Sequence, residues 1–521
     1  MKKIFLIILF LLVNFIFAKN IQNGQIIKTK TFLLDTAMDS NTVYHYAIGY
    51  HDTIFTVIWK HGSDSLRLKR FSKNYQNIDT VAKTLPPISQ GPGICMNQDS
   101  IFIVYGLVWG FLEAEDIELA TMSRGNLSNI TVKTIAAGYW ETPSDTTCDV
   151  LKFMEPAIAC TDSKLLITFK RYEFNDENGW SPSEFGPRIE GVIISLQNQN
   201  MVYITIKDSS MRSGFLQNAD FNRPTSVCSG DSSFWVLWPY DKKVHYLLIK
   251  MLPDDSTSVS GGVLYESNQR INMGGNAISY GEGNFIGVWG DYNNGAHAIM
   301  ASRMNNNGEI IDSATVIYTN QNVKGTPSIS YNGQYFIVVW PEFISVPTEN
   351  SLYRTRHVMG FYNIKGIMMD SSFNIIEQFN ITNDTSDQIS PFIKTADNNV
   401  SMILYTNIDH AGGISLWGAL TNYYSGIKRN SNINEEGNLA KVEYINNEGK
   451  SVLKYSLQNT LHIKINIYNL TGRVVKSYDF GNQAKGTYYL NMDFNKYTNG
   501  VYFYNFQYNN KSINGKLVNI K

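Results

Sequence analysis

The chain has 521 residues, of which 13% are aromatic and 17% charged, and its formal net charge is −1 at pH 7. Basic and acidic residues are mixed throughout, so the sequence shows no basic patch that would mark a nucleic-acid partner. A chain of this length exceeds what one compact core buries, unless that core is built from repeats. Abundant Tyr, Phe, Asn and Ser favour β-strands joined by polar turns.

Residues 1–18 predict a secretory signal peptide. Lys2 and Lys3 supply a positive n-region, and the apolar run over residues 4–17 is broken only by Asn14 before it ends at Ala18. The run is shorter than the ~20 residues that a membrane-spanning helix needs. We therefore expect cleavage after Ala18 and no transmembrane segment in the mature chain.

Residues 22–36 predict a single β-strand that stands ahead of a series of repeats. The repeats share one pattern: an apolar strand, often led by proline, then a polar turn and a very apolar second strand that ends in a large aromatic. The closing aromatics are Trp59, Tyr105, Phe169, Trp238, Trp289, Trp340 and Tyr405. The leading prolines are Pro92, Pro156, Pro224, Pro327 and Pro391. A third and a fourth strand follow, and four antiparallel strands are the unit of a β-propeller blade.

The pattern predicts an all-β fold in which a seven-bladed β-propeller, with six to eight blades compatible with the spacing, precedes a C-terminal β-sandwich. The seventh repeat lacks a fourth strand after residues 414–420. We expect strand 22–36 to supply it and to close the ring, because closure removes exposed sheet edges. The predicted domains are a signal peptide (1–18), a propeller (19–427), a linker (428–440) and a sandwich (441–521).

Three long segments follow second strands, and we expect them to form loops around the central channel on one face of the ring: residues 106–115, 170–188 and 341–357. Aromatic side chains beside charged groups suit a carbohydrate or peptide site. The candidate ligand-binding residues are Trp109, Tyr172, Glu173, Trp180, Phe185, Glu342, Phe343, Tyr353, Arg356 and His357. The alternative is that these loops pack on the blade tops and bind nothing.

Acidic residues recur shortly after the closing aromatics, namely Glu173, Asp241, Asp291, Glu342 and Asp409. A ring of carboxylates can hold a cation or form the acid/base pair of a glycosidase. We favour turn chemistry instead, in which each carboxylate accepts backbone N–H bonds in its own loop. Residues 175–180 resemble a sialidase Asp-box loosely, and we favour an ordinary polar turn there. The eight histidines show no ligand spacing, and we expect neither a metal nor a cofactor.

The four cysteines are too few to staple a chain of this size. Cys95, Cys160 and Cys228 each precede a closing aromatic by nine or ten residues, which favours burial as small apolar side chains in inner strands. Cys148 with Cys160 is the one disulfide pair that we consider.

The last eighty residues alternate apolar and polar positions, as in residues 463–468, and contain hairpin turns with glycine. In order and position they resemble the type A C-terminal sorting domain of the type IX secretion system, an immunoglobulin-like module, although the usual Pro-Asn-Pro opener is missing before Tyr444. The residues that carry the resemblance are Gly472, Arg473, Gly486, Gly500 and Lys516. It implies export by the type IX machinery to the outer surface of a Gram-negative bacterium or beyond.

The sequence predicts a secreted or cell-surface propeller that binds or adheres to an extracellular glycan or protein, because no catalytic constellation stands out. The first alternative is an extracellular polysaccharide hydrolase or lyase that uses carboxylates such as Glu173, Asp176 and Glu342. A second alternative is a structural component of the cell surface.

Overall fold

The computed structural model of the chain contains strands and no helix among the residues it describes. These are 17–22, 25–36, 45–62, 65–73, 76–79, 82–85, 90–109, 114–144, 147–176, 188–206, 225–240, 242–252, 256–267, 275–293, 296–345, 360–396, 400–423, 440–447, 450–469, 473–492, 500–508 and 511–519. The predicted signal peptide and linker lie almost entirely outside them. The chain divides into two units, of which the larger holds Ile26–Tyr423 and the smaller Tyr424–Lys521.

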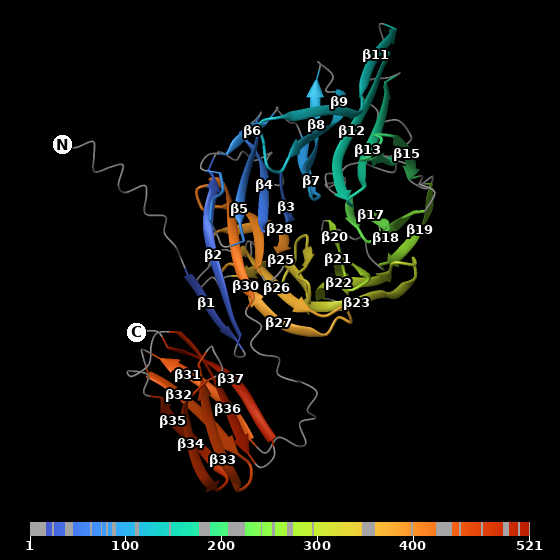
Figure 1. Cartoon of the computed structure of the whole chain (residues 1–521). Helices are drawn as coiled ribbons and strands as arrows, with labels where there is room; N and C mark the ends of the chain where they lie inside the picture. The colour runs from blue at the N-terminus through green and yellow to red at the C-terminus, as the bar shows by residue number, and fades with distance from the viewer. Residues whose placement is uncertain are drawn as a thin grey trace, which may run out of the picture. The chain divides into compact units, whose positions relative to one another are not determined.

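The larger unit is a ring of seven antiparallel blades, which confirms the predicted β-propeller (Figure 1). Blades I to III contain β3 (Tyr46–His51), β4 (Ile54–His61), β5 (Ser65–Ser72) and β6 (Lys83–Leu85); β7 (Gln90–Met96), β8 (Ser100–Trp109), β9 (Ala114–Ser123) and β10 (Ile130–Ala136); and β12 (Thr147–Cys160), β13 (Lys164–Asp176), β14 (Arg188–Ser195) and β15 (Met201–Ile206).

Blades IV to VI follow the same order of four strands. They contain β16 (Ser226–Ser229), β17 (Ser233–Tyr240), β18 (Lys243–Met251) and β19 (Thr257–Glu266); β20 (Asn276–Gly281), β21 (Asn284–Asn293), β22 (Ala296–Asn305) and β23 (Ile310–Asn320); and β24 (Ser328–Tyr331), β25 (Phe336–Ser345), β26 (Gly360–Met369) and β27 (Ile375–Asn380).

Blade VII is completed from the other end of the chain. Its strands are β28 (Asp387–Ala396), β29 (Val400–Ile408), β30 (Ile414–Tyr423) and β2 (Gln25–Asp35), with β1 (Phe17–Gln22) paired to β2. In the antiparallel register of β2 and β30, Lys28 lies opposite Asn422 and Leu33 opposite Trp417. The strand expected at residues 22–36 thus occupies the fourth position of the last blade.

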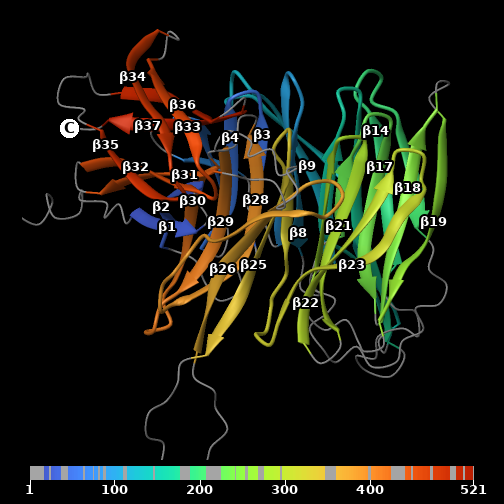
Figure 2. The same cartoon turned by 90° about the horizontal axis from the view of Figure 1, so that it is seen from below.

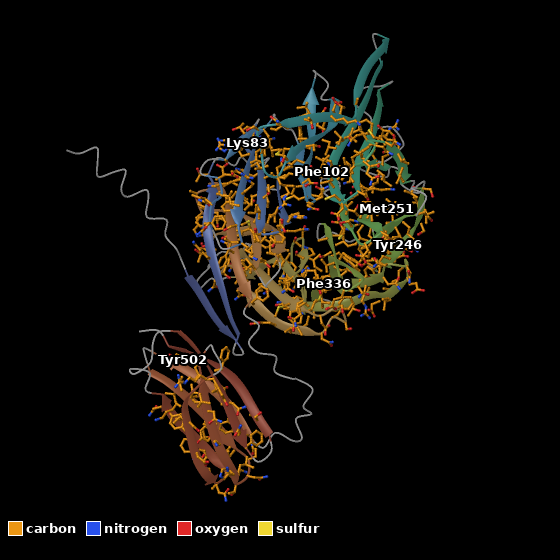
Figure 3. All side chains as sticks on the ribbon, viewed as in Figure 1. Lys83, Phe102, Tyr246, Met251, Phe336 and Tyr502 are labelled. Carbon is orange, nitrogen blue, oxygen red and sulfur yellow. The ribbon has the colours of Figure 1, made fainter. Side chains whose placement is uncertain are left out.

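The core of the ring lies between the blades. Among the described residues, each of the seven junctions holds its own cluster of buried side chains, and the inner strand of each blade contacts the inner strands of both neighbours. Figure 3 labels two of these side chains, Phe102 between blades II and III and Phe336 between V and VI. It also labels Tyr246, which is half-buried and packs against the cluster between blades IV and V. The second strands are covered on both faces, which explains their continuous apolar runs.

The leading prolines of blades II, III and VII sit at β-bulges in the inner strands. The pairing register shifts between Gln90 and Gly93, between Met154 and Ala157, and between Ile389 and Phe392. Glu155 and Ser390, which precede two of these prolines, have φ values of 54° and 57°. A proline lacks the N–H that a regular ladder position needs, so a bulge accommodates it.

Blades II and III are joined into one nine-stranded sheet. A single parallel bridge between Lys152 and Glu115 links β12 to β9, and β11 (Tyr139–Ser144) pairs with the first half of β12. In Figure 1, β11 and the adjoining ends of β12 and β13 project from the ring.

The smaller unit is a β-sandwich of two sheets. One has the order β31 (Ala440–Asn447), β32 (Lys450–Leu457) and β35 (Gly486–Met492). The other has the order β34 (Val474–Gln483), β33 (Leu461–Tyr468), β36 (Gly500–Tyr508) and β37 (Lys511–Asn519). Tyr502, labelled in Figure 3, belongs to the buried cluster that both sheets share.

The structure contradicts the Cys148–Cys160 disulfide that the sequence analysis considered. Both residues lie on the single strand β12, which runs from Thr147 to Cys160. Twelve residues of extended chain span about 40 Å, whereas a disulfide holds two Cα atoms within about 7 Å. Cys95, Cys160 and Cys228 are free and half-buried, and they lie on the inner strands β7, β12 and β16 as expected.

Candidate functional site

Where the structure describes the long segments after the second strands, their strands extend beyond the blades on one face of the ring. β13 pairs with β12 as far as Asp176, while its other partner, β14, stops at Arg188 opposite Arg171. β25 pairs with β26 as far as Ser345, whereas its pairing with the inner strand β24 extends only as far as Val339. We call this face, which also carries the connections between successive blades, the rim. Figure 2 shows the strands from the side.

Extended pairing corrects the expectation of three loops. β8 continues to Trp109, paired with Ala114 of β9, so only residues 110–113 remain between these strands. Asn175 and Asp176, expected in a polar turn, belong to β13. These extensions carry no regular apolar pattern, and for that reason the sequence did not distinguish them from loops.

The structure places the predicted site residues on three different blades. The backbone of Trp109 lies at the end of β8, and those of Tyr172 and Glu173 lie in β13 opposite Lys152 and Leu151. Glu342 and Phe343 lie together on β25. The other candidates lie outside the described residues: Trp180, Phe185, Tyr353, Arg356 and His357.

Glu342 is fully buried at the junction of blades V and VI. Its Oε1 accepts hydrogen bonds from Asn320 Nδ2 at 3.1 Å, from Asn322 Nδ2 at 3.2 Å and from Lys365 Nζ at 2.6 Å. Its Oε2 accepts one from Trp340 Nε1 at 3.4 Å. Because each donor is held by a strand or its flanking turn, the carboxylate fastens β25 to β26 and to the end of β23.

A second ammonium group completes this cluster. Lys324 is 1% exposed; its Nζ lies 3.9 Å from Glu342 Oε2 and donates to the Asn322 carbonyl at 2.9 Å. It also lies 5.3 Å from the ring centre of Tyr318, close enough for a cation–π contact. We call Tyr318, Asn320, Asn322, Lys324, Trp340, Glu342 and Lys365 the Glu342 cluster.

The charges in the Glu342 cluster shift one another's pKa values. Burial alone would raise the pKa of Glu342, but hydrogen bonds from Lys365, Asn322 and Asn320 outweigh it and hold that pKa below its usual value. Burial lowers the pKa of Lys324 to about 8, against the attraction of Glu342. The pKa of Lys365 is raised: its hydrogen bond and attraction to Glu342 outweigh the effect of burial.

The same arrangement recurs at the junction of blades IV and V. The ring centre of Trp289 lies 5.5 Å from that of Tyr265, and the buried Asp291 accepts hydrogen bonds from Tyr265 Oη at 2.7 Å and Ser267 Oγ at 3.1 Å. A carboxylate two residues after a closing tryptophan thus binds the outer strand of the preceding blade in both cases.

A carboxylate and a closing tryptophan also meet at the junction of blades VII and I. There the carboxylate comes from the outer strand of the preceding blade instead of from the strand that carries the tryptophan. Asp35, at the end of β2, accepts a hydrogen bond from Trp59 Nε1 at 2.6 Å, and its Oδ2 lies 2.6 Å from His61 Nδ1. The closing strand therefore joins blade I as well as blade VII.

These contacts revise the two hypotheses for the recurrent acids. Asp409 agrees with the favoured hypothesis of turn chemistry, since its Oδ1 accepts hydrogen bonds from the N–H groups of Ala411 and Gly413 in its own turn. Glu342 follows neither, because it binds across a blade junction. Asp291 also binds across a junction, and its Oδ1 accepts the Tyr292 N–H at 2.7 Å as well. The sequence could not show this, since their partners lie in other repeats.

Two further buried acids lie on blade II, at Glu118, and on blade III, at Glu155. Glu155 pairs with Lys170, and Glu118 accepts a hydrogen bond from Thr134 Oγ1 at 2.8 Å. Burial raises the pKa of Glu118, an effect that the Thr134 hydrogen bond reduces and the nearby Asp116 reinforces.

In the part of the chain that the structure describes, no three His, Cys, Asp or Glu side chains are grouped as a metal site. The same residues include no helix long and apolar enough to cross a membrane.

Comparison with protein families identifies the smaller unit. The family model for the secretion system C-terminal sorting domain matches residues 447–521, as the sequence predicted. Arg473, Gly486, Gly500 and Lys516 lie within its described strands or at their ends, and Gly472 lies outside the described residues. This domain indicates export through the type IX secretion system to the cell surface or extracellular space.

A search of curated proteins finds no match to the chain. Among solved structures, Trypanosoma rangeli sialidase matches with 10% identity and a TM-score of 0.37, over 65% of this chain and 56% of the sialidase. Its complex with sialic acid matches with 9% identity and a TM-score of 0.38, over 90% and 89%. The catalytic domain of Coprinopsis cinerea GH62 alpha-L-arabinofuranosidase matches with 9% identity and a TM-score of 0.28, over 52% and 90%. At these values none of the three indicates a function.

Proposed function

We propose that the protein is exported through its sorting domain and that the propeller then binds an extracellular glycan or protein through the rim, without catalysis. The observation that carries this proposal is the extension of the β8–β9, β12–β13 and β25–β26 hairpins beyond their blades on one face. Long connections on a rigid scaffold are where binding residues concentrate.

The state of the buried carboxylates supports binding over hydrolysis. A glycosidase needs two carboxyl groups that reach the substrate, one of them protonated. Glu342 is 0% exposed and surrounded by donors that keep its pKa low, so it is suited to holding blades together. Phe343, beside it on β25, packs edge-on against Tyr362 with ring centres 5.2 Å apart and supplies a rigid aromatic base for the hairpin.

Arrays of bacterial and host glycans and of surface-protein fragments, probed with the purified propeller, test this function. Two pruned variants follow from the strand register. One replaces residues 172–187 with a short turn between Arg171 and Arg188, and the other replaces residues 346–359 with Asn-Gly between Ser345 and Gly360. The matched control is Asn198→Ala, in the exposed turn on the opposite face of blade III.

We expect a signal for the intact propeller and the control, and a loss of about tenfold or more in the pruned variant whose hairpin carries the contact. Trp180→Ala and Tyr353→Ala then test single side chains within the pruned segments. Absence of any signal contradicts the proposal, and a signal that both pruned variants retain leaves only the β8–β9 hairpin of the rim to carry the contact. Release of sugar from a bound glycan would favour the hydrolase instead.

A further inference from the structure

Two thiols face each other across the junction of blades II and III. Cys95 lies on the inner strand β7 and Cys160 on the neighbouring inner strand β12, and both pack against the same buried cluster. Another cysteine, Cys228 on β16, packs instead against the cluster between blades IV and V.

The close approach of the two strands brings these thiols together. At Gly93, an added Cβ would lie 3.2 Å from Ile158 Cγ2 and 3.4 Å from the Ile158 nitrogen, so the backbones nearly touch at this point. Cys95 and Cys160 each follow two residues later, and inner strands of successive blades run in the same direction. The Cys160 side chain is a hydrogen-bond neighbour of the Cys95 thiol.

We propose that Cys95 and Cys160 form a disulfide that ties blade II to blade III in the exported protein. In the reaction both S–H bonds break and one S–S bond forms. The two electrons and two protons pass to the disulfide of a thiol oxidoreductase outside the cytoplasm, which becomes a dithiol. Export places the chain in the compartments where such bonds persist.

The junction is one where a covalent tie has a structural role. Here the chain leaves the regular blade pattern to form β11, and the Lys152–Glu115 bridge already joins β9 to β12 beside the buried cluster that the two blades share. Burial, together with the neighbouring Cys160, raises the pKa of the Cys95 thiol well above its ordinary value, although Lys394 on β28 opposes this. Because the thiolate is the reactive form, oxidation in the folded ring is slow at neutral pH and faster at high pH.

Mass spectrometry of the secreted full-length protein tests the pairing. The protein is alkylated without reduction under denaturing conditions and then digested. We expect a Cys95–Cys160 linked peptide about 2 Da lighter than the two reduced peptides together, with Cys148 and Cys228 alkylated. Reduced protein refolded with oxidised glutathione should regain the same link.

Variants separate this pair from any other. Cys95→Ser and Cys160→Ser should each remove the linked peptide and lower the urea midpoint of the oxidised protein, whereas Cys228→Ser should leave the link in place. Should a serine variant fail to fold, the wild-type mass measurement alone decides the question. Four free thiols in the secreted protein that stay unlinked with oxidised glutathione, or a link that involves Cys148 or Cys228, would overturn the proposal.

Discussion

Leu33 lies opposite Trp417 in the antiparallel pairing of β2 with β30, so a strand from the start of the chain completes the last blade of the ring. The contact also reaches blade I, because the neighbouring Phe32 lies 5.5 Å from the ring of Phe71 on β5. The closing strand therefore holds two blades, and the stability of the whole propeller depends on it.

Removing the aromatic ring from the closing strand should destabilise the propeller. Phe32 is half-buried, and an added Cβ at Gly418 would lie 2.4 Å from its ring, so Phe32→Ala leaves a cavity. We expect a loss of about 2 kcal/mol in the free energy of unfolding, measured with urea. Leu33→Thr, on the exposed side of the same strand, should change it by less than about 0.5 kcal/mol. Equal effects of the two changes would mean that β2 is not docked as described.

Glu342→Gln should destabilise the junction of blades V and VI at neutral pH. The change removes the charge that balances Lys324 and Lys365, and breaking a buried ion pair on one side costs about 3 to 5 kcal/mol. Asp409→Asn, at an exposed turn, is the control and should cost about 1 kcal/mol.

The acid limb of the stability curve provides a second measurement. The folded pKa of Glu342 is below its usual value of 4.5, so its contribution is present above that pH and is lost as pH falls through the folded pKa. The wild-type protein should therefore lose more stability on acidification than Glu342→Gln does. Parallel curves for the two proteins would show that the carboxylate is not paired.

Lys324 should produce the opposite trend on the alkaline side. Its folded pKa is about 8 against 10.5 when unfolded, so the folded state binds fewer protons between these values and its stability rises with pH there. Compared with Lys324→Met, the wild-type free energy of unfolding should therefore increase from pH 8 to pH 10.5. Lys250→Met, near the surface of blade IV, controls for general effects of losing a lysine. A wild-type curve that falls relative to Lys324→Met over this range would be incompatible with a buried ammonium.

Gly281→Ala should disturb the junction of blades V and VI by steric overlap. The added Cβ would lie 2.3 Å from Cγ of Tyr331 on β24, and we expect a loss of about 1 to 3 kcal/mol in the free energy of unfolding. Gly125→Ala, whose Cβ would meet nothing nearer than Ser123 Oγ at 3.9 Å, should be nearly neutral. A neutral Gly281→Ala would place the two inner strands further apart than described.

Deleting residues 447–521 should stop export while leaving the propeller folded. The sorting domain has its own buried core, so its loss does not open the ring. Fractionation and immunoblotting should find the truncated protein retained in the cell, and Tyr489→Ser, at a position 63% exposed, should be exported normally. Surface delivery of the truncated chain would refute the role of this domain.

The repeated apolar strands made the propeller predictable. Each closing aromatic, such as Trp340, lies in a strand covered on both faces, and this burial leaves a continuous apolar run in the sequence. The closing role of residues 22–36 followed from the missing fourth strand of the seventh repeat. The sorting domain was predictable for a different reason, since its glycine turns and its alternation of apolar and polar residues lie within one short contiguous segment.

The polar contacts between blades were not predictable from the sequence. Lys324 and Glu342 come from the connection before blade VI and from its second strand, and no local pattern records their approach. The Cys148–Cys160 prediction failed because both residues lie on the one continuous strand β12. The sequence predicted loops at the hairpin extensions because residues 106–115, 170–188 and 341–357 show no regular apolar period.

Hydrogen exchange on the secreted protein, with and without its strongest array partner, is the sharpest test of binding through the rim. We expect slowed exchange at residues 106–115, 170–188 or 341–359 on the rim, and unchanged exchange at the opposite-face turns 305–309 and 370–374. Protection confined to those opposite-face turns or to the sorting domain would contradict it.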